Sequence, residues 1–319
     1  MEAEMDSVLS SMADAVGKEA FQKIRARLKE KLSYPPVIVF MGKTGAGKSS
    51  TCNAVFGQTA FRESPVDVGT RECQVEIVDE KLTIVDVPGL GEGGKYSEEY
   101  RNLYRKILTN GVIDRRTGKS FKIDAIIWLI KSGDRALQVD HDFYKDVFVR
   151  DDDSGLSDTS RLIFAISQAD AMEPIDPDEQ GSWDRSHGRP GTAQAANLDK
   201  KRRQIADLFG IESNLVIEFS SKKRYNLDRL LERVISTLPN EKVPLTVEIA
   251  KGNDERVKAA PSEKAVSPAI EQKAEETLWQ VIRGVVIEYA PMAWKAIEAY
   301  LPPVIKLVSK GLRKLIKWL

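Results

Sequence analysis

Short apolar runs alternate with amphipathic stretches through the middle of this chain, from residue 37 to residue 238. The apolar runs are long enough for buried parallel strands, and the stretches between them have the apolar spacing of helices. The predicted strands are 37–41, 73–78, 81–87, 125–130, 161–167 and 214–219, and the predicted helices are 51–56, 97–108, 196–209 and 227–238. This alternation predicts an α/β fold with a mainly parallel sheet covered by helices on both faces.

The segments on either side of this region have a different pattern. Residues 4–33 carry apolar stripes at helical spacing, and Pro35-Pro36 ends that helix before the first strand. After the α/β region come Pro, Ala, Glu and Lys with little periodicity, and then long apolar stretches. The sequence therefore predicts an N-terminal helical segment over 1–34, an α/β domain over 35–240, a linker over 241–268 and a C-terminal helical segment over 269–319.

The last stretch, 303–319, is aliphatic on one helical face and basic on the other, and it contains no acidic residue. The aliphatic face comprises Ile305, Val308, Leu312, Leu315, Ile316 and Leu319, and the basic face comprises Lys306, Lys310, Arg313, Lys314 and Lys317. This pattern is typical of a helix that lies on an anionic membrane surface, and it also suits an acidic protein partner. The alternative is that the aliphatic face packs on other helices of the same chain.

The charge balance and the cysteine content argue against several classes of function. Lys+Arg and Asp+Glu are 48 each, so overall charge gives no support for nucleic-acid binding, although a local basic patch stays open. Cys52 and Cys73 alone cannot build a disulfide framework or a thiolate metal site. The acidic N-terminus has no apolar signal core, which favours a cytoplasmic location. Binding of 303–319 to lipid would make that location peripheral at the inner membrane face.

Residues 42–50 carry the strongest chemical signal, because they follow the first predicted strand, precede a helix and match G-x-x-x-x-G-K-[ST]. Glycines let such a loop wrap around phosphates, with amide groups pointing inward at a helix N-terminus. Lys48 would reach the β- and γ-phosphates, and the Ser49 hydroxyl would bind Mg²⁺. The alternative is a plain glycine-rich turn. The preceding strand, the spacing of the motif and the Lys-Ser pair argue against that alternative. The predicted binding residues are Gly42, Lys43, Thr44, Gly45, Ala46, Gly47, Lys48, Ser49 and Ser50.

Two later stretches suit a loop that senses the γ-phosphate. Thr70 ends a stretch rich in Gly, Pro and Ser, where its hydroxyl and carbonyl could approach Mg²⁺, although threonine before a strand is common. Asp86 ends a predicted strand and would hold Mg²⁺ through a water, and the Gly89 amide would contact the γ-phosphate. The glycine-rich residues 90–94 suit the mobility that a switch requires.

Arg135 lies in a charged loop that follows the predicted strand 125–130. This loop is at the sheet edge where ligands of α/β proteins bind. We predict that Arg135 stabilises the charge on the transferred phosphate, in cis or across a dimer. A solvated surface charge is the competing interpretation.

Taken together, these stretches resemble translation-factor-class GTPases of the Era-like group, in particular the YfjP-type GTPases of bacterial chromosomes and prophages. That type is itself similar to interferon-inducible GTPases. The resemblance covers 35–240 and implies a P-loop GTPase domain that binds GTP and GDP with Mg²⁺ and hydrolyses GTP. It is carried by MGKTGAGKSS (41–50), GTRE (69–72), DVPG (86–89), WLIK (128–131), DRAL (134–137) and QAD (168–170).

Two positions depart from the usual motifs of that group. Where Asn/Thr-Lys-x-Asp is usual, this chain has Ser167-Gln168-Ala169-Asp170. Asp170 can accept the N1–H and N2–H groups of guanine, which adenine lacks, while the missing Lys stem implies modest affinity. Ser221-Lys222 matches the usual Ser-Ala-Lys stretch and would offer a backbone amide to guanine O6. Leu90 stands where a water-orienting Gln is usual, which implies slow intrinsic hydrolysis.

These features lead us to expect a GTP-binding and GTP-hydrolysing molecular switch. Its nucleotide state would control the terminal helices and their contact with an unidentified protein effector or a membrane, and a nucleotide-dependent homodimer is part of this expectation. The alternative is a membrane-surface or self-assembling nucleotide-binding protein with little intrinsic turnover. A third interpretation is an ATP-dependent enzyme that shares only the phosphate loop, against which Asp170 argues.

Overall fold

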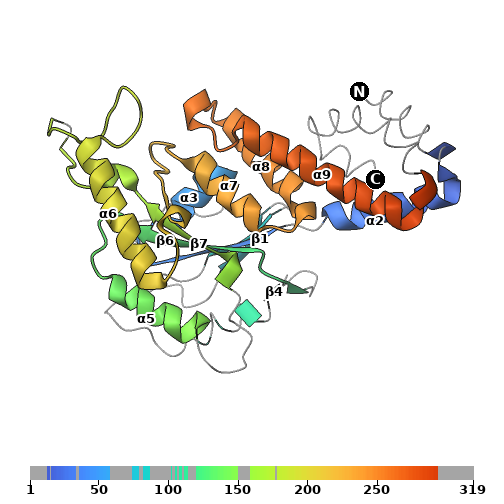
Figure 1. Ribbon diagram of the computed structural model, residues 1–319, viewed down its shortest axis with the longest axis horizontal. Helices are drawn as coiled ribbons and strands as arrows, with labels where there is room; N and C mark the ends of the chain where they lie inside the picture. Colours follow the sequence, from blue (N-terminus) through green and yellow to red (C-terminus); the bar gives the residue numbers. More distant parts are fainter. Residues whose placement is uncertain are drawn as a thin grey trace.

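The computed structural model describes residues 13–14, 16–33, 36–57, 74–78, 82–86, 102, 105, 108–109, 111–113, 120–149, 159–176 and 178–293. Figure 1 shows a central sheet with helices on both sides, and a longer helical part to one side in which α9 lies against α2. The helices are α2 (Lys18–Ser33), α3 (Lys48–Phe56), α5 (Leu137–Phe148), α6 (Thr192–Phe209), α7 (Leu227–Thr237), α8 (Val243–Arg256) and α9 (Pro268–Tyr289).

Among the described residues, six strands form the central sheet in the order β2-β3-β1-β6-β7-β8. Their bounds are Val37–Gly42 (β1), Gln74–Val78 (β2), Leu82–Asp86 (β3), Ala125–Lys131 (β6), Leu162–Ser167 (β7) and Ile217–Glu218 (β8). All neighbouring pairs are parallel except β2 and β3, which pair antiparallel at one edge. A separate short hairpin pairs β4 (Val112–Ile113) with β5 (Ser120–Phe121).

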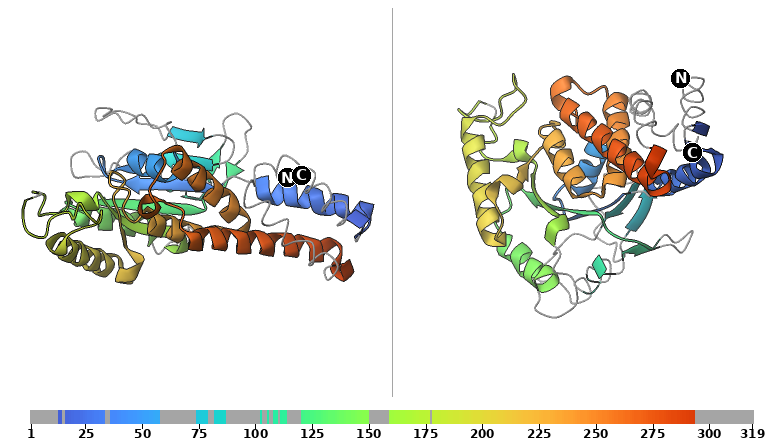
Figure 2. Two further views of the ribbon diagram at one scale, coloured as in Figure 1. Left: turned by 90° about the horizontal axis from the view of Figure 1, so that it is seen from above. Right: turned by 45° about the vertical axis from the view of Figure 1, so that its right-hand side comes forward.

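Side chains of the central strands alternate between the two faces of the sheet, and each face has its own core. On one face, Met41 and Trp128 pack with α5 and α6. On the other face, Ile38 and Phe40 pack with α3, α7, α8 and α9, and Figure 2 shows these layers from two further directions. Because both faces are covered, the residues of β1 and β7 are all buried, which explains their continuous apolar sequences. The predicted fold class is confirmed.

The segment 241–268, which the sequence predicts to be a linker, is largely helical and joins the core through α8, so that prediction is wrong. Its main element is α8, whose Val243, Leu245, Val247 and Ile249 lie in the same core as α3 and α9. Nearly every residue of 243–250 is buried, which explains the missing periodicity there, because a helix that is covered all round has no polar face opposite an apolar one.

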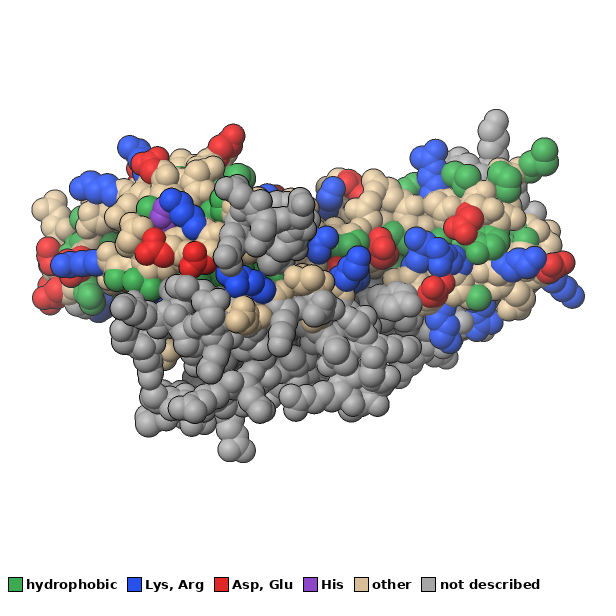
Figure 3. Space-filling view, turned by 90° about the horizontal axis from the view of Figure 1, so that it is seen from below, with side chains coloured by type: hydrophobic (Ala, Val, Ile, Leu, Met, Phe, Trp, Pro, Cys, Tyr) green, Lys and Arg blue, Asp and Glu red, His purple; other side chains and the backbone are tan. Residues whose placement is uncertain are grey.

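The N-terminal helical segment contains α2, whose buried Ile24, Leu28 and Leu32 join the core that includes α9. In the described part of the chain, we find no helix that is both long and apolar enough to cross a membrane. Figure 3 shows basic and acidic side chains interspersed over the described elements on one face of the molecule. The basic amphipathic stretch 303–319 lies outside the described residues, so its membrane-surface role stays a prediction.

Candidate functional site

The phosphate loop connects β1 to α3, and three of its glycines adopt backbone conformations that L side chains rarely adopt. The φ angles of Gly42, Gly45 and Gly47 are 141°, 76° and 87°. At Gly42 a Cβ atom would lie only 2.4 Å from the carbonyl O of Leu129 on the neighbouring strand. Glycine is therefore required where the loop leaves the sheet, and the loop can curl tightly before α3 begins.

The N-terminus of α3 forms the floor of this loop. α3 begins at Lys48, so the amide groups of its first turn have no acceptor within the helix and attract anions. Lys48 Nζ donates to the carbonyl O of Gly42 at 3.3 Å, which places the ammonium across the loop. Thr51 Oγ1 donates to the carbonyl O of Gly47 at 2.7 Å and fixes the junction, and Ser49 is partly exposed beside it. These groups fit a chain of phosphates with a divalent cation at the Ser49 hydroxyl.

Two hydrogen bonds tie the phosphate loop to the loop that follows β7. Ser167 Oγ donates to the carbonyl O of Ala46 at 2.7 Å, and Gln168 Nε2 donates to the carbonyl O of Gly45 at 2.8 Å. Gln168 has a left-handed backbone with φ 56°, just before a short 3-10 turn. Gln168 therefore links the two loops directly, a role that comparison with the usual Lys-containing motif does not reveal.

Asp170 faces the turn that follows β8. Ser220 Oγ donates to Asp170 Oδ1 at 2.6 Å, and Ser221 Oγ donates to Thr51 Oγ1 at 3.3 Å. The structure thus brings Asp170, Ser221 and α3 together, while Lys222 is exposed on the same turn. Sequence reasoning missed Ser220, and the only signal for it was its position next to the predicted Ser221-Lys222 pair.

The side chain of Lys43 leaves the phosphate loop and joins a cluster of charges beyond β6. Its Nζ lies 2.7 Å from Asp134 Oδ2, from Asp140 Oδ2 and from the carbonyl O of Ala136. Burial raises the pKa of Asp140, which is 1% exposed. Burial disfavours the Lys43 ammonium as well, but its bonds to Asp134 and Asp140 raise its pKa nonetheless. The ammonium of Lys43 therefore ties the phosphate loop to the loop that carries Arg135.

Arg135 is exposed beside a cavity of about 1020 Å³ that adjoins the phosphate loop. Thr44 and Gln168 line the cavity together with Arg135 and Lys201. Lys201 is 8% exposed, and burial lowers its pKa. Arg135 therefore lines the same cavity as Thr44 of the phosphate loop.

The sequence of this chain is similar to those of several known proteins. The model of the AIG1 family matches residues 37–115. The Escherichia coli (strain K12) protein YkfA is 33% identical over 240 residues, which cover 74% of this chain and 74% of YkfA. YfjP from the same organism is 34% identical over 223 residues, which cover 69% of this chain and 68% of YfjP. The chain belongs to the YfjP-type family of P-loop GTPases.

A similar solved structure is that of Toc33 from Arabidopsis thaliana in complex with GDP and Mg²⁺. It covers 81% of this YfjP-type chain and 99% of the Toc33 chain, with 18% identity and a TM-score of 0.42.

The remaining predicted site residues of this YfjP-type GTPase belong to the segment between α3 and β6. Asp86 is the last residue of β3, and its register partner is Phe40 on β1, so the structure places it near the strand that leads into the phosphate loop. Thr70 and Gly89 lie outside the described residues, as does Leu90. Their roles at Mg²⁺ and the γ-phosphate stay predictions.

Replacing Lys43 in this YfjP-type GTPase is expected to destabilise the fold. Lys43→Met leaves the buried Asp140 carboxylate without its cation, and breaking a buried pair in this way costs about 3 kcal/mol of the free energy of unfolding. Urea unfolding measures this loss. Burial without the cation raises the pKa of Asp140 further above its unfolded value, so the variant should lose more stability at pH 8 than at pH 5. Adding Asp140→Leu to Lys43→Met should restore part of the stability; a loss independent of Asp140 would contradict this account.

Proposed function

We propose that this protein binds GTP and GDP with Mg²⁺, hydrolyses GTP slowly, and acts as a switch whose nucleotide state controls the helices beyond the α/β domain. The observation that carries the proposal is the double tie between the phosphate loop and the Ser167–Asp170 turn. The hydrogen bonds from Ser167 and Gln168 fix the position of this turn, which carries the Asp170 carboxylate, relative to the phosphate loop. The carboxylate would bind the base and the loop would bind the phosphates. A molecule with a guanine base and a phosphate chain suits both parts at once.

The base preference follows from the chemistry of Asp170. Its carboxylate can accept two N–H groups from the edge of guanine, and Ser220 orients the carboxylate through Oδ1. Adenine offers no such pair of donors, so a carboxylate desolvated against adenine would lack partners. A backbone amide of Ser221-Lys222 would donate to the O6 atom of guanine.

The phosphates would be bound by Lys48 and by the amide groups at the start of α3. Ser49 and Asp86 would hold Mg²⁺, with Thr70 as the further ligand that the sequence predicts. The cation, when bound, neutralises charge on the phosphate oxygens. The tight glycine conformations and the partly exposed Ser49 support this assignment, because they leave room for phosphates against the backbone.

Slow hydrolysis is proposed because Leu90 cannot orient a water molecule as a Gln would. Arg135 is the candidate group for stabilising the transferred phosphate, either in its own site or across a homodimer. A self-assembling protein with little turnover would use the same binding residues, and a measured rate of GTP hydrolysis separates the two functions.

The test of guanine binding is Asp170→Asn. This variant replaces an acceptor with an amide that donates, so it should weaken GDP binding about 100-fold and favour xanthine nucleotides. Loss of two charge-assisted hydrogen bonds at about 1.5 kcal/mol each gives this magnitude. Competition of labelled GDP by XDP, GTP and ATP measures it, with the exposed Asp207→Asn on α6 as the matched control. Wild-type protein that binds ATP as tightly as GTP would show that Ser167–Asp170 does not read the base.

A further inference from the structure

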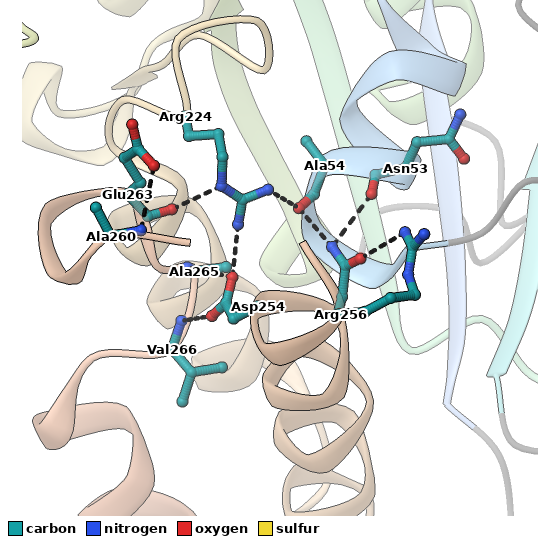
Figure 4. A network of polar contacts seen from close by, with 10 residues as sticks. Asn53, Ala54, Arg224, Asp254, Arg256, Ala260, Glu263, Ala265 and Val266 are labelled. Atoms are coloured by element: carbon teal, nitrogen blue, oxygen red, sulfur yellow. Dashed lines mark hydrogen bonds and ion pairs between the residues drawn. The ribbon is translucent and has the colours of Figure 1, made fainter. Parts of the chain in front are cut away.

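The C-terminal end of α3 is capped by side chains from two other elements (Figure 4). Arg224, in the turn between β8 and α7, donates from Nη1 to the carbonyl O of Ala54 at 3.0 Å. Asn253 of α8 donates from Nδ2 to the carbonyl O atoms of Ala54 and Asn53 at 2.9 and 3.2 Å. The last carbonyls of a helix need such partners, and a cation there also interacts favourably with the helix dipole. The helix that begins at the phosphate loop is therefore fixed at its other end by this turn and by α8.

Arg224 also holds the connection between α8 and α9 (Figure 4). Its Nη2 lies 2.5 Å from Asp254 Oδ1, and its Nε donates to the carbonyl O of Glu263 at 3.0 Å. Asp254 is 3% exposed and accepts the backbone N–H groups of Ala265 and Val266 at 3.1 and 2.9 Å. One buried carboxylate therefore joins Arg224 to the residues that lead into α9.

The same turn contacts the base-binding side of the site. Its first residues donate to Asp170 and to Thr51, as described above for Ser220 and Ser221. Ser220 and Tyr225 exchange backbone hydrogen bonds of 3.1 and 3.0 Å, which close residues 220–225 into a compact unit. This unit lies between Asp170 and the α8–α9 connection and contacts both.

Arg224 also has an uncommon backbone conformation for a residue with a side chain. Its φ is 49°, in the left-handed region, and its side chain is 16% exposed. A residue with a side chain keeps such a conformation only where surrounding contacts fix it, so the position of the guanidinium depends on the contacts that close the turn.

We propose that Arg224 is a positioning residue that couples nucleotide binding to docking of the α8–α9 connection. This inference rests on the proposed function, because it needs a guanine nucleotide at Asp170. A base bound by Asp170 and the Ser221-Lys222 backbone stabilises the closed unit of residues 220–225 against opening, and the closed unit holds Arg224 against Asp254. Because coupling between two binding events is reciprocal, release of the connection weakens nucleotide binding by the same factor. A static buttress, by contrast, would stabilise the protein equally with and without nucleotide.

Hydrogen exchange of the full chain, with and without GDP and Mg²⁺, tests the coupling. The informative amides are those of Ala265 and Val266, since they donate to Asp254. GDP should slow their exchange in the wild type roughly tenfold, within the range usual for coupled sites. Arg224→Met keeps the aliphatic stem of the side chain and should bind GDP roughly tenfold more weakly. In this variant GDP should no longer slow the exchange of these two amides. The matched control is Arg203→Met, an arginine on α6 that is 70% exposed and should behave as wild type.

The outcomes separate the coupling from a structural role and from the proposed function itself. Absence of slowing in the wild type, or equal slowing in wild type and Arg224→Met, overturns the coupling. Reduced stability of Arg224→Met with the slowing intact identifies a static buttress and also overturns it. If Arg224→Met does not fold, Arg224→Lys keeps the charge and is judged by the same comparison. Direct titration with labelled GDP is run in parallel, and wild-type protein that fails to bind in that titration rejects the proposed function.

Discussion

Replacing Lys48 with alanine is expected to abolish GTP binding while the fold stays intact. The Lys48 ammonium lies across the phosphate loop, 3.3 Å from the carbonyl O of Gly42. Contacts of this ammonium with two phosphate oxygens, at about 2 kcal/mol each for hydrogen bonds to charged groups, correspond to on the order of 10³-fold in Kd. The fold should lose only about 1 kcal/mol, the net value of one ordinary hydrogen bond.

Titration with a fluorescent GTP analogue measures the loss of affinity, and thermal unfolding reports the fold. Lys273→Ala serves as the matched control, because that lysine is exposed on α9, outside the site. Near-normal GTP affinity in a folded Lys48→Ala protein would remove Lys48 from the binding site. The phosphate loop would then have to be assigned another role.

Arg135→Ala is expected to reduce the rate of GTP hydrolysis on the order of 10³-fold with little change in GTP affinity. The loop that carries Arg135 is well fixed, because Asp134 is bonded to Lys43 and accepts the Ala136 amide at 2.9 Å. Ser132 Oγ adds a hydrogen bond of 2.7 Å to the carbonyl O of Gln168. If the phosphates bind at the phosphate loop as proposed, an arginine on a fixed loop would lose less entropy when it stabilises the transition state.

Single-turnover hydrolysis over a range of protein concentrations measures this effect and separates two arrangements. A rate independent of concentration indicates that Arg135 acts in its own site, whereas a rate that rises with concentration indicates action across a dimer. Arg135→Lys keeps the charge without the planar guanidinium and should recover only part of the rate. Unchanged turnover of Arg135→Ala at every concentration would return Arg135 to the solvated-charge interpretation.

The parts of the site that sequence could predict are those fixed by local chemistry. The glycine spacing of residues 42–47 reflects backbone conformations that other residues rarely adopt, so the motif is visible without a structure. Continuous apolar strands likewise revealed a sheet covered on both faces. Both signals arise from neighbouring residues, which a linear pattern records directly.

The parts that sequence could not predict depend on contacts between distant segments. Lys43 reads as a phosphate-loop residue, yet its ammonium pairs with Asp134 and Asp140 beyond β6. In the sequence, Gln168 only marks the absence of the usual Lys, yet its side chain donates a hydrogen bond to the phosphate loop. The sequence of α8 resembles a linker because packing against helices that include α3 and α9 leaves nearly every residue of 243–250 buried, so no apolar stripe stands out. In each case a deciding partner, which for α8 is α3, lies far away in the chain.

The packing of α2 against α9 has a consequence for biosynthesis. α2 ends at Ser33 and α9 begins at Pro268, so the ribosome makes all the strands from β1 to β8 between the two. At roughly 5–20 residues per second, α2 waits on the order of ten seconds or more for its partner. During that time the apolar stripe of Ile24, Leu28 and Leu32 lacks the α9 part of its native cover. The helix α2 is thus made before the sheet but fully packed only after it, and the nascent chain carries an incompletely covered apolar stripe, of the kind that chaperones bind, until α9 has been made.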